Sequence, residues 1–296
     1  MKKSSILALI IGIITVIAGI FICICSLLGA KLSNEALFLL ESSPDGNIVY
    51  TYDLTGQSIG AVSIDLSKDI QVNIRSGESD RIEFINFPAG TYNTSISTRI
   101  LSINDDLNLL AMPGLGNDSN FSGLRNLLYN LVFANKEKSI NVYISPKSQI
   151  NSLSVKTPSS ISVTDLTCRT DLTLRSEGSG ITMSDCAISS FVTLEGAWAT
   201  VGTSNVRKLE ITSTNGNISI IRSSITNCTA SALLGDIIAE LTCEPTQVAL
   251  SAKCSSGVVM LDEEVLGASL EQPVLSPVQT FDLTAKRGNI TILSDT

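Results

Sequence analysis

A short phrase of residues recurs along the second half of this chain and constrains its fold more than any other feature. The phrase has an alternating apolar pair, a turn on a small residue, and then a second alternating apolar pair. Clear copies occupy residues 213–220 (STNGNISI) and 285–292 (AKRGNITI), and a looser copy occupies residues 232–237. A phrase that returns at a nearly fixed interval is typical of solenoid proteins, in which each copy forms one coil.

The turn of the phrase is expected on glycine or another small residue. In five copies the turn residue is glycine: Gly180, Gly216, Gly235, Gly257 and Gly288. Two further copies have Ser160 and Ala199 at that point. Glycine at a corner permits a positive φ or lets successive backbones stack closely. Each turn follows an apolar pair such as Leu153/Val155 or Val248/Leu250.

This pattern predicts an all-β chain whose exterior domain is a parallel β-solenoid, or β-helix. Two strands of six or seven residues with their turns fill about 19 residues, which is close to one small coil. Alternation then sends Leu, Val and Ile inward and Ser, Thr and Asn outward. The alternative is an antiparallel β-sandwich, because its hairpin turns would also fall every 8–12 residues or so. The solenoid is favoured because the phrases themselves repeat.

The N-terminal part predicts one transmembrane helix. Residues 6–30 carry no charge, and a helix needs about 20 apolar residues to cross a bilayer. Lys2 and Lys3 precede this run, so the positive-inside rule places residues 1–5 in the cytoplasm and the bulk of the chain outside the cell. The alternative is a cleaved signal peptide, whose apolar stretch is usually shorter. We therefore expect a single-pass protein of the cell membrane.

The exterior part divides into a linker and a repeat domain. Residues 31–58 form a juxtamembrane linker, and period-2 alternation begins at residue 59 and continues to residue 296. Residues 101–139 interrupt the alternation and are expected to be an irregular insertion, because a structureless loop of that length is unusual.

Composition excludes several functional classes. The net charge is −8 and Lys and Arg do not cluster, which disfavours a nucleic-acid surface. Histidine is absent, which removes His-based acid–base catalysis, Ser-His-Asp triads and zinc sites that use imidazole. The sequence predicts no catalytic residue, no metal site and no cofactor.

Two pairs of residues are candidates for a covalent or chemical role. Cys168 and Cys186 are 18 residues apart, so stacking in adjacent coils makes them candidates for a disulfide; the alternative is two small buried thiols. Asp165 and Asp185 occupy equivalent coil positions, and a carbohydrate-active β-helix enzyme would need such paired acids. The simpler interpretation of the two aspartates is a solvated outer ladder.

Two acidic runs are candidates for calcium ligands. They are Asp105-Asp106 and residues 262–264, and neither has the spacing with which an EF-hand loop wraps the ion in oxygens. Solvated loop charges are the better interpretation.

The order of these pieces resembles a known bacterial family, the β-strand-repeat "putative adhesin" family, a domain of unknown function. The resemblance is carried by the strands at residues 61–74, by the strand ending in proline at residues 140–146, and by the Ser-x-x-Gly-x-Ile phrase at residues 213–218. It covers roughly residues 59–296. The resemblance implies a β-solenoid-like exterior domain in a bacterial envelope protein, commonly behind an N-terminal membrane helix, and implies no catalytic residues.

These observations predict a non-enzymatic, membrane-anchored surface or envelope protein, adhesin-like or scaffolding, that binds surface glycans or envelope proteins through a repetitive polar face. The alternatives are an envelope-stress sensory or regulatory protein and, with least support, a carbohydrate-active enzyme. Packing explains every repeated position, so a binding site is expected where the repeat fails, at residues 101–139 or 261–279.

Overall fold

The computed structural model describes residues 41–42, 47–87, 93–105 and 136–294. The chain divides into two compact units, residues 1–50 and 51–296. In the first unit, β1 (Glu41–Ser42) pairs antiparallel with the start of β2 (Ile48–Asp53). The predicted anchor at residues 6–30 lies outside the described residues. Within the part of the chain that is described, no helix is both long enough and apolar enough to span a bilayer.

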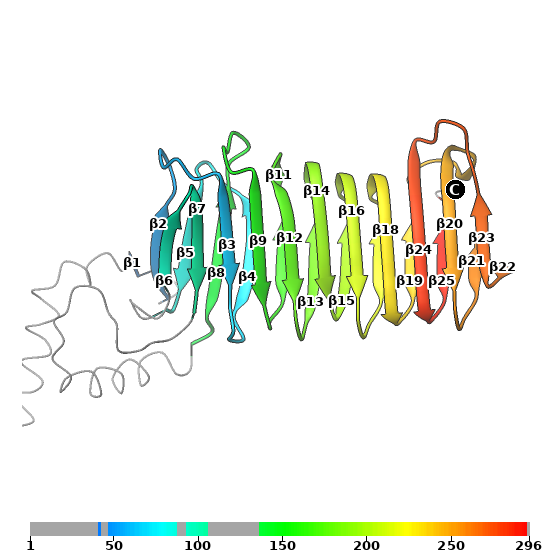
Figure 1. The fold of residues 1–296 in the computed structure, drawn as a ribbon, viewed down its shortest axis with the longest axis horizontal. Helices are drawn as coiled ribbons and strands as arrows, with labels where there is room; N and C mark the ends of the chain where they lie inside the picture. The colour runs from blue at the N-terminus through cyan, green and yellow to red at the C-terminus, as the bar shows by residue number, and fades with distance from the viewer. Residues whose placement is uncertain (1–40, 43–46, 88–92, 106–135, 295–296) are drawn as a thin grey trace, which may run out of the picture. The chain divides into compact units, whose positions relative to one another are not determined.

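The second unit consists of two long sheets, here named sheet A and sheet B (Figure 1). The strands of sheet A, in spatial order, are β5 (Arg81–Ile85), β8 (Ser139–Ile144), β4 (Gln71–Ser76), β10 (Ile161–Thr164), β13 (Gly180–Ser184), β15 (Trp198–Gly202), β17 (Ile218–Ile221), β19 (Ile237–Glu240), β25 (Ile290–Leu293), β21 (Val259–Leu261) and β22 (Glu264–Gly267).

The strands of sheet B, in spatial order, are β6 (Asn93–Ser97), β7 (Ile100–Asn104), β3 (Ala61–Asp65), β9 (Ser152–Thr157), β12 (Asp171–Ser176), β14 (Ala187–Gly196), β16 (Asn205–Ser213), β18 (Ser224–Leu234), β24 (Gln279–Arg287), β20 (Val248–Cys254) and β23 (Ser269–Gln272). The short strand β11 (Thr167–Cys168) also pairs with β14. A single turn of 3-10 helix, Pro245–Gln247, precedes β20.

The architecture is the predicted parallel β-solenoid rather than an antiparallel sandwich. Each coil contributes one strand to each sheet, as β12 does before the chain turns into β13, and neighbouring coils pair in parallel. In sheet B, for example, Leu172 lies between Leu153 of the preceding coil and Val192 of the next. All three side chains are buried between the sheets. Period-2 alternation thus produces apolar columns that run along the axis of the stack.

The order of coils in space differs from the order in the sequence at both ends. At one end, β7 and β8 lie outside β3 and β4, although they come later in the chain. At the other end, the last strands in the sequence, β24 and β25, lie inside β20 and β21, with β18 and β19 on their other side (Figure 1). The repeating phrase does not predict this inversion.

Antiparallel strands cover the outermost coil at each end. β5 and β6 pair antiparallel with β8 and β7, and β22 and β23 pair antiparallel with β21 and β20. A long sheet edge presents many unpaired N–H and C=O groups to other chains. The terminal strands β22 and β23 have only four residues each, and such short edge strands limit edge-to-edge association.

Several predicted positions need correction. The irregular insertion predicted at residues 101–139 is shorter at both ends. It starts later because Leu101 and Ile103 point inward from β7, and it ends earlier because Ser139 is the first residue of β8. The apolar pair predicted as Val248/Leu250 is two residues too early in the strand. The pair equivalent to Phe281 and Leu283 of the adjacent strand β24 is Leu250/Ala252. The alternation of β20 continues for two more residues, so either pair fits the sequence pattern.

The corner between the two sheets contains a column of glycines. A Cβ on Gly235 would lie 2.3 Å from the carbonyl oxygen of Gly216, one on Gly288 would lie 2.1 Å from that of Gly235, and one on Gly257 would lie 2.0 Å from that of Gly288. Gly235 and Gly288 also have φ values of 140° and 141°. These positions require glycine, because a side chain would collide with backbone of the next coil and the φ is unfavourable for other residues.

We predict that Gly288→Ala strongly destabilises the fold. The new Cβ meets backbone that cannot move aside, and the positive φ adds strain, so the free energy of unfolding should fall by at least about 2 kcal/mol. Chemical denaturation of the full chain measures this loss. Gly202→Ala is the matched control, because no atom lies within 4 Å of its Cβ position. Equal stability of the two variants would contradict the packing argument.

Candidate binding surface

The outward face of sheet B carries a continuous row of hydroxyl side chains. The five residues of this hydroxyl row occupy one register position on consecutive strands: Ser102, Ser63, Ser154, Thr173 and Thr193. All five are partly or fully exposed. Neighbouring strands are about 4.8 Å apart, so the row presents hydroxyl groups at that repeat. A hydroxyl both donates and accepts hydrogen bonds, which suits contact with a polar polymer.

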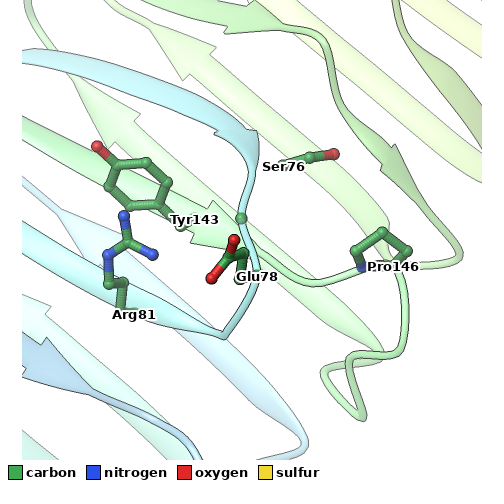
Figure 2. A pocket seen from close by; sticks show the side chains of 6 residues that line it. Ser76, Glu78, Arg81, Tyr143 and Pro146 are labelled. Atoms are coloured by element: carbon green, nitrogen blue, oxygen red, sulfur yellow. The ribbon is translucent and has the colours of Figure 1, made fainter.

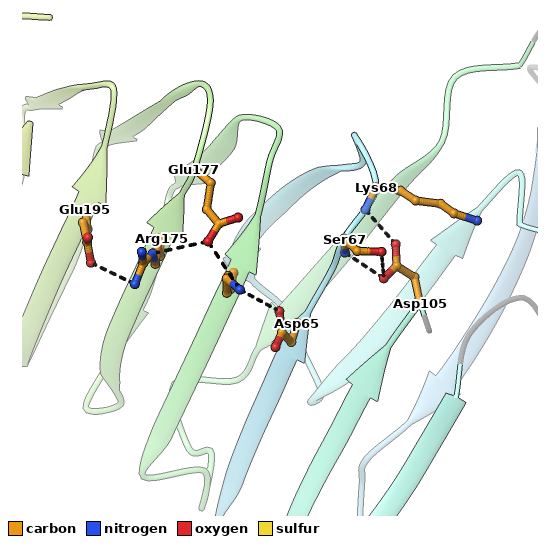
Figure 3. A network of polar contacts seen from close by, with 8 residues as sticks. Asp65, Ser67, Lys68, Asp105, Arg175, Glu177 and Glu195 are labelled. Atoms are coloured by element: carbon orange, nitrogen blue, oxygen red, sulfur yellow. Dashed lines mark hydrogen bonds and ion pairs between the residues drawn. The ribbon is translucent and has the colours of Figure 1, made fainter. Parts of the chain in front are cut away.

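A charged row lies beside the hydroxyl row, two residues further along the same strands. It contains Asp65, Lys156, Arg175 and Glu195 on successive strands. The Lys156 Nζ atom is 3.7 Å from Asp65 Oδ1, and Arg175 Nη1 is 3.7 Å from Glu195 Oε2. Glu177, from the following turn, bridges Lys156 at 3.3 Å and Arg175 at 3.7 Å (Figure 3). Across the strands the row thus has two cations, Lys156 and Arg175, flanked by the anions Asp65 and Glu195, and the Glu177 carboxylate lies between the two cations.

This charged row organises the surface more than it stabilises the fold. Its side chains are 41–64% exposed, and exposed ion pairs contribute only about 0–1 kcal/mol each. The linked pairs nevertheless hold the long side chains in place next to the hydroxyl row.

A buried carboxylate anchors the turn at the end of β3. Asp105, which is 4% exposed, accepts hydrogen bonds from the Ser67 amide at 2.7 Å, the Ser67 hydroxyl at 3.0 Å and the Lys68 amide at 2.8 Å (Figure 3). The sequence analysis interpreted Asp105 as a solvated loop charge rather than a calcium ligand, and its burial shows that the first part of this interpretation is wrong. Its oxygens are instead occupied by donors of this turn, so its role here is to fix the β3–β4 connection.

Sheet A carries a second polar row on its own outward face. The register aligns Asn141, Asn73, Ser162, Thr182, Thr200 and Ser219. The Asn73 side-chain amide donates to Asn141 Oδ1 at 3.0 Å. Beyond Ser219 the row becomes apolar at Ile238. The solenoid therefore presents hydroxyl rows on both faces, but only the row on sheet B is bordered by the charged row.

A shallow depression lies near the β5 end of sheet A. It is lined by Ser76, Gly77, Glu78, Arg81, Tyr143 and Pro146 (Figure 2). The guanidinium carbon of Arg81 is 3.7 Å from the centre of the Tyr143 ring, and that of Arg75 is 4.8 Å away. Tyr143 also donates to Glu83 Oε2 at 3.0 Å and accepts from Arg75. Because β8 lies between β5 and β4, the two arginines reach the Tyr143 ring from the two neighbouring strands. Both guanidinium groups already lie over the ring.

The glycines predicted as turns do not all share one position. Gly216, Gly235, Gly257 and Gly288 belong to the corner column described above. Gly180 is one position further on, paired with Trp198, whose ring covers the place where a Gly180 side chain would be. The turn predicted at Ala199 is wrong, because Ala199 is a buried strand residue beside Ile218. Ala197 is the residue that faces Gly216.

Cys168 and Cys186 are free, buried thiols. They do not occupy equivalent positions, because Cys168 pairs with Ile188 while Cys186 aligns with Leu166 and Ser204. Equivalent positions in these two coils are 20 residues apart, as Leu166 and Cys186 are, whereas the two cysteines are 18 residues apart. The two thiols are therefore offset by two residues along the strand. Cys186 donates to the Ser184 carbonyl at 3.1 Å. Burial raises its pKa to about 11.

The acidic residues proposed for chemistry have exposed, peripheral positions. Asp165 and Asp185 do stack, since the Asp165 amide donates to Ser184 and the Asp185 amide donates to Gly202 in the next coil, with φ values of 50° and 55°. Aspartate tolerates this left-handed conformation better than most residues, which explains the pair without catalysis. Over the described ranges, no group of three or more metal-ligating side chains comes together.

The predicted irregular segment at residues 261–279 forms the capping strands β22 and β23 and an exposed loop. Asp262 accepts from the Ser294 amide at 2.7 Å and the Ser294 hydroxyl at 2.5 Å, and these hydrogen bonds lower the pKa of Asp262. Leu275 is 99% exposed, and Val265 and Val278 are also exposed. Of the other predicted site segment, residues 106–135 lie outside the described residues.

Comparison with known proteins agrees with this architecture. The profile of the Toastrack DUF4097 family matches residues 59–272. The chain belongs to the Toastrack DUF4097 family. No curated protein matches this chain. The resemblance to β-strand-repeat adhesins inferred from the sequence is therefore confirmed at the level of the family.

Several solved structures are similar to this Toastrack chain. A "putative adhesin" from Parabacteroides merdae is 12% identical, with 84% of this chain and 96% of that chain covered and a TM-score of 0.38. A "putative adhesin" from Bacteroides fragilis is 12% identical, with coverages of 86% and 99% and a TM-score of 0.36. A "putative cell adhesion protein" from Clostridium sporogenes is 12% identical, with coverages of 83% and 99% and a TM-score of 0.34.

The sequence predicted only part of the hydroxyl row. Alternation predicts outward Ser and Thr residues, but not which of them share a register position. The charged row gave no signal, because its members are far apart in the sequence and only the stacking order joins Asp65 to Lys156.

We predict that the buried thiols make the Toastrack domain less stable at alkaline pH. Burial, and to a smaller degree the charge of Asp282, raise the pKa of Cys228 from 9.0 to about 12. Between these values the unfolded thiol loses its proton and the folded one does not, so the free energy of unfolding falls as pH rises above about 9. Urea denaturation between pH 8 and pH 11 measures the slope. Cys228→Ala should flatten it, and an unchanged slope would contradict the assignment.

Proposed function

We propose that this protein is a non-enzymatic, membrane-anchored module of the cell surface or envelope that binds repeating polar polymers, such as surface glycans, through sheet B. The observation that carries the proposal is the hydroxyl row, with the charged row beside it. Neither row forms a deep cleft. A flat surface with a repeat of about 4.8 Å favours many weak contacts over one tight site.

The two rows supply complementary chemistry. The hydroxyl row offers donors and acceptors without a net charge, so it suits sugar hydroxyls. The charged row lies about 6.6 Å away along each strand and offers both signs, so it suits the carboxylate and amino groups that many surface polymers carry. Its ion pairs already hold these side chains in position, which reduces the entropy lost on binding.

Valine substitution in the hydroxyl row tests this assignment. In Thr173→Val/Thr193→Val the shape and β-propensity remain, but two hydroxyl groups are lost from sheet B. Loss of two hydrogen bonds of about 1 kcal/mol each should weaken binding by roughly tenfold or more. The measurement is binding of the full chain, multimerised on beads, to an array of surface glycans.

Thr182→Val/Thr200→Val is the matched control, because it makes the same change on sheet A. We expect it to bind like the unmodified chain. The assignment to sheet B fails if both double variants lose binding equally. The proposal as a whole fails if the multimerised chain binds no glycan.

Anchoring is proposed from residues 6–30, whose length and lack of charge suit a membrane span. The chain should remain with membranes after an alkaline wash, and N-terminal sequencing of that fraction should begin at or next to Met1. A mature N-terminus close to Ala30, with the protein released from membranes, would instead support cleavage of a signal peptide.

A further inference from the structure

The C-terminal coil, formed by β24 and β25, fills a slot inside the solenoid. The chain leaves β19, crosses that slot through the single 3-10 turn, and builds β20, β21, β22 and β23 on the far side. It then returns through residues 273–278 and places its last two strands in the gap (Figure 1). The coils from β9 to β19 instead stack in sequence order.

The inserted coil is bonded on both sides. In sheet B, β24 pairs in parallel with β18 over seven register positions and with β20 over seven. In sheet A, β25 pairs with both β19 and β21. Its apolar side chains are fully buried between the sheets: Phe281, Leu283, Ala285, Ile290 and Ile292. Removal of this segment would open two strand edges in each sheet and expose the core between them.

The corner of the slot fits this segment closely. Gly288 is needed where the segment passes Gly235, because a Cβ there would lie 2.1 Å from the Gly235 carbonyl oxygen. The Asn289 amide donates to Asp236 Oδ1 at 2.7 Å, and Asn289 Oδ1 accepts from the Val258 amide at 3.0 Å. The side of the slot at Gly235 therefore requires glycine at position 288, and the side at Val258 binds the Asn289 side chain. A second copy of this chain carries the same matching segment.

The connection to the inserted coil has the properties of a hinge. Residues 273–278 contain Pro273 and Pro277, and Leu275 is 99% exposed. The Val278 amide donates to the Gln247 carbonyl at 2.9 Å, at the end of the connection. Prolines stiffen such a connection in an extended form, and exchange of an identical element through a hinge is a known route to dimers.

We propose that the C-terminal coil exchanges between two copies of this chain, so that residues 279–293 of each copy fill the slot of the other. Every strand pairing of the single chain is kept in the exchanged dimer, and only the path of residues 273–278 changes. The partner is a second copy because the slot reads the Gly288-Asn289 sequence and the apolar spacing of this segment. The exchange does not depend on the proposed function, although a dimer would double the number of binding faces.

The test uses cysteine pairs that only exchange brings together. Thr229 and Asp282 face outward at one register position of β18 and β24, a separation suitable for a disulfide. One full-length chain carries Thr229→Cys and a second, differently tagged chain carries Asp282→Cys. The two are unfolded together, refolded in detergent and oxidised. A covalent heterodimer on a non-reducing gel is expected, and a tenfold rise in protein concentration should raise the dimer-to-monomer ratio by up to about tenfold.

The matched control mixes a Glu210→Cys chain with a Thr229→Cys chain. These residues share a register position of β16 and β18, neither of which exchanges, so no heterodimer is expected. The double variant Thr229→Cys/Asp282→Cys in one chain reports on folding, because it should form its disulfide in either arrangement. The proposal is overturned if the double variant links only within single chains while the mixed chains give no more heterodimer than the control. Failure of the double variant to link at all, when Glu210→Cys/Thr229→Cys does link, would overturn the placement of β24 itself.

Discussion

In-register parallel pairing of successive coils is the constraint on which this structure depends. It converts the period-2 alternation of each strand into continuous columns: apolar ones between the sheets, and polar ones on the two outer faces. The glycine column at the corner is where this pairing is least tolerant, since the backbone of one coil occupies the space that a side chain on the next would need. The hydroxyl row and the charged row exist only because the same register holds across the adjacent strands β7, β3, β9, β12 and β14.

The sequence predicted the coil architecture well, because the signal for it is local. Alternation within β9, β12, β14 and β16 marks which residues face inward, and the repeated phrase separates a solenoid from a sandwich. The alignment of copies was less reliable. Trp198 takes the place beside Gly180 that the pattern assigned to a small residue, and this displaced the predicted turn to Ala199. Spacing alone also suggested that Cys168 and Cys186 stack, but the coil that joins their positions is longer than their separation.

The order of the coils could not be predicted for a different physical reason. The strands β18, β20 and β24 have similar alternation, and the glycines at residues 235, 257 and 288 mark similar turns, so these two local features do not determine which coil lies beside which. Which neighbour a coil takes depends on the connections and on contacts such as that of Asn289 with Asp236, which act over long separations in the sequence. The charged row escaped prediction for the same reason, because its ion pairs cross between coils.

The inverted order at the two ends also affects how the domain is made. A solenoid whose coils follow the sequence can grow by adding each new coil to a finished edge as the chain emerges. Here β20 and β21 are synthesised before the coil that separates them from β18 and β19. The core at that end therefore stays open until β24 and β25 have been translated. A chain truncated before β24 would therefore display an unfilled gap, with unpaired strand edges of the kind that lead to aggregation.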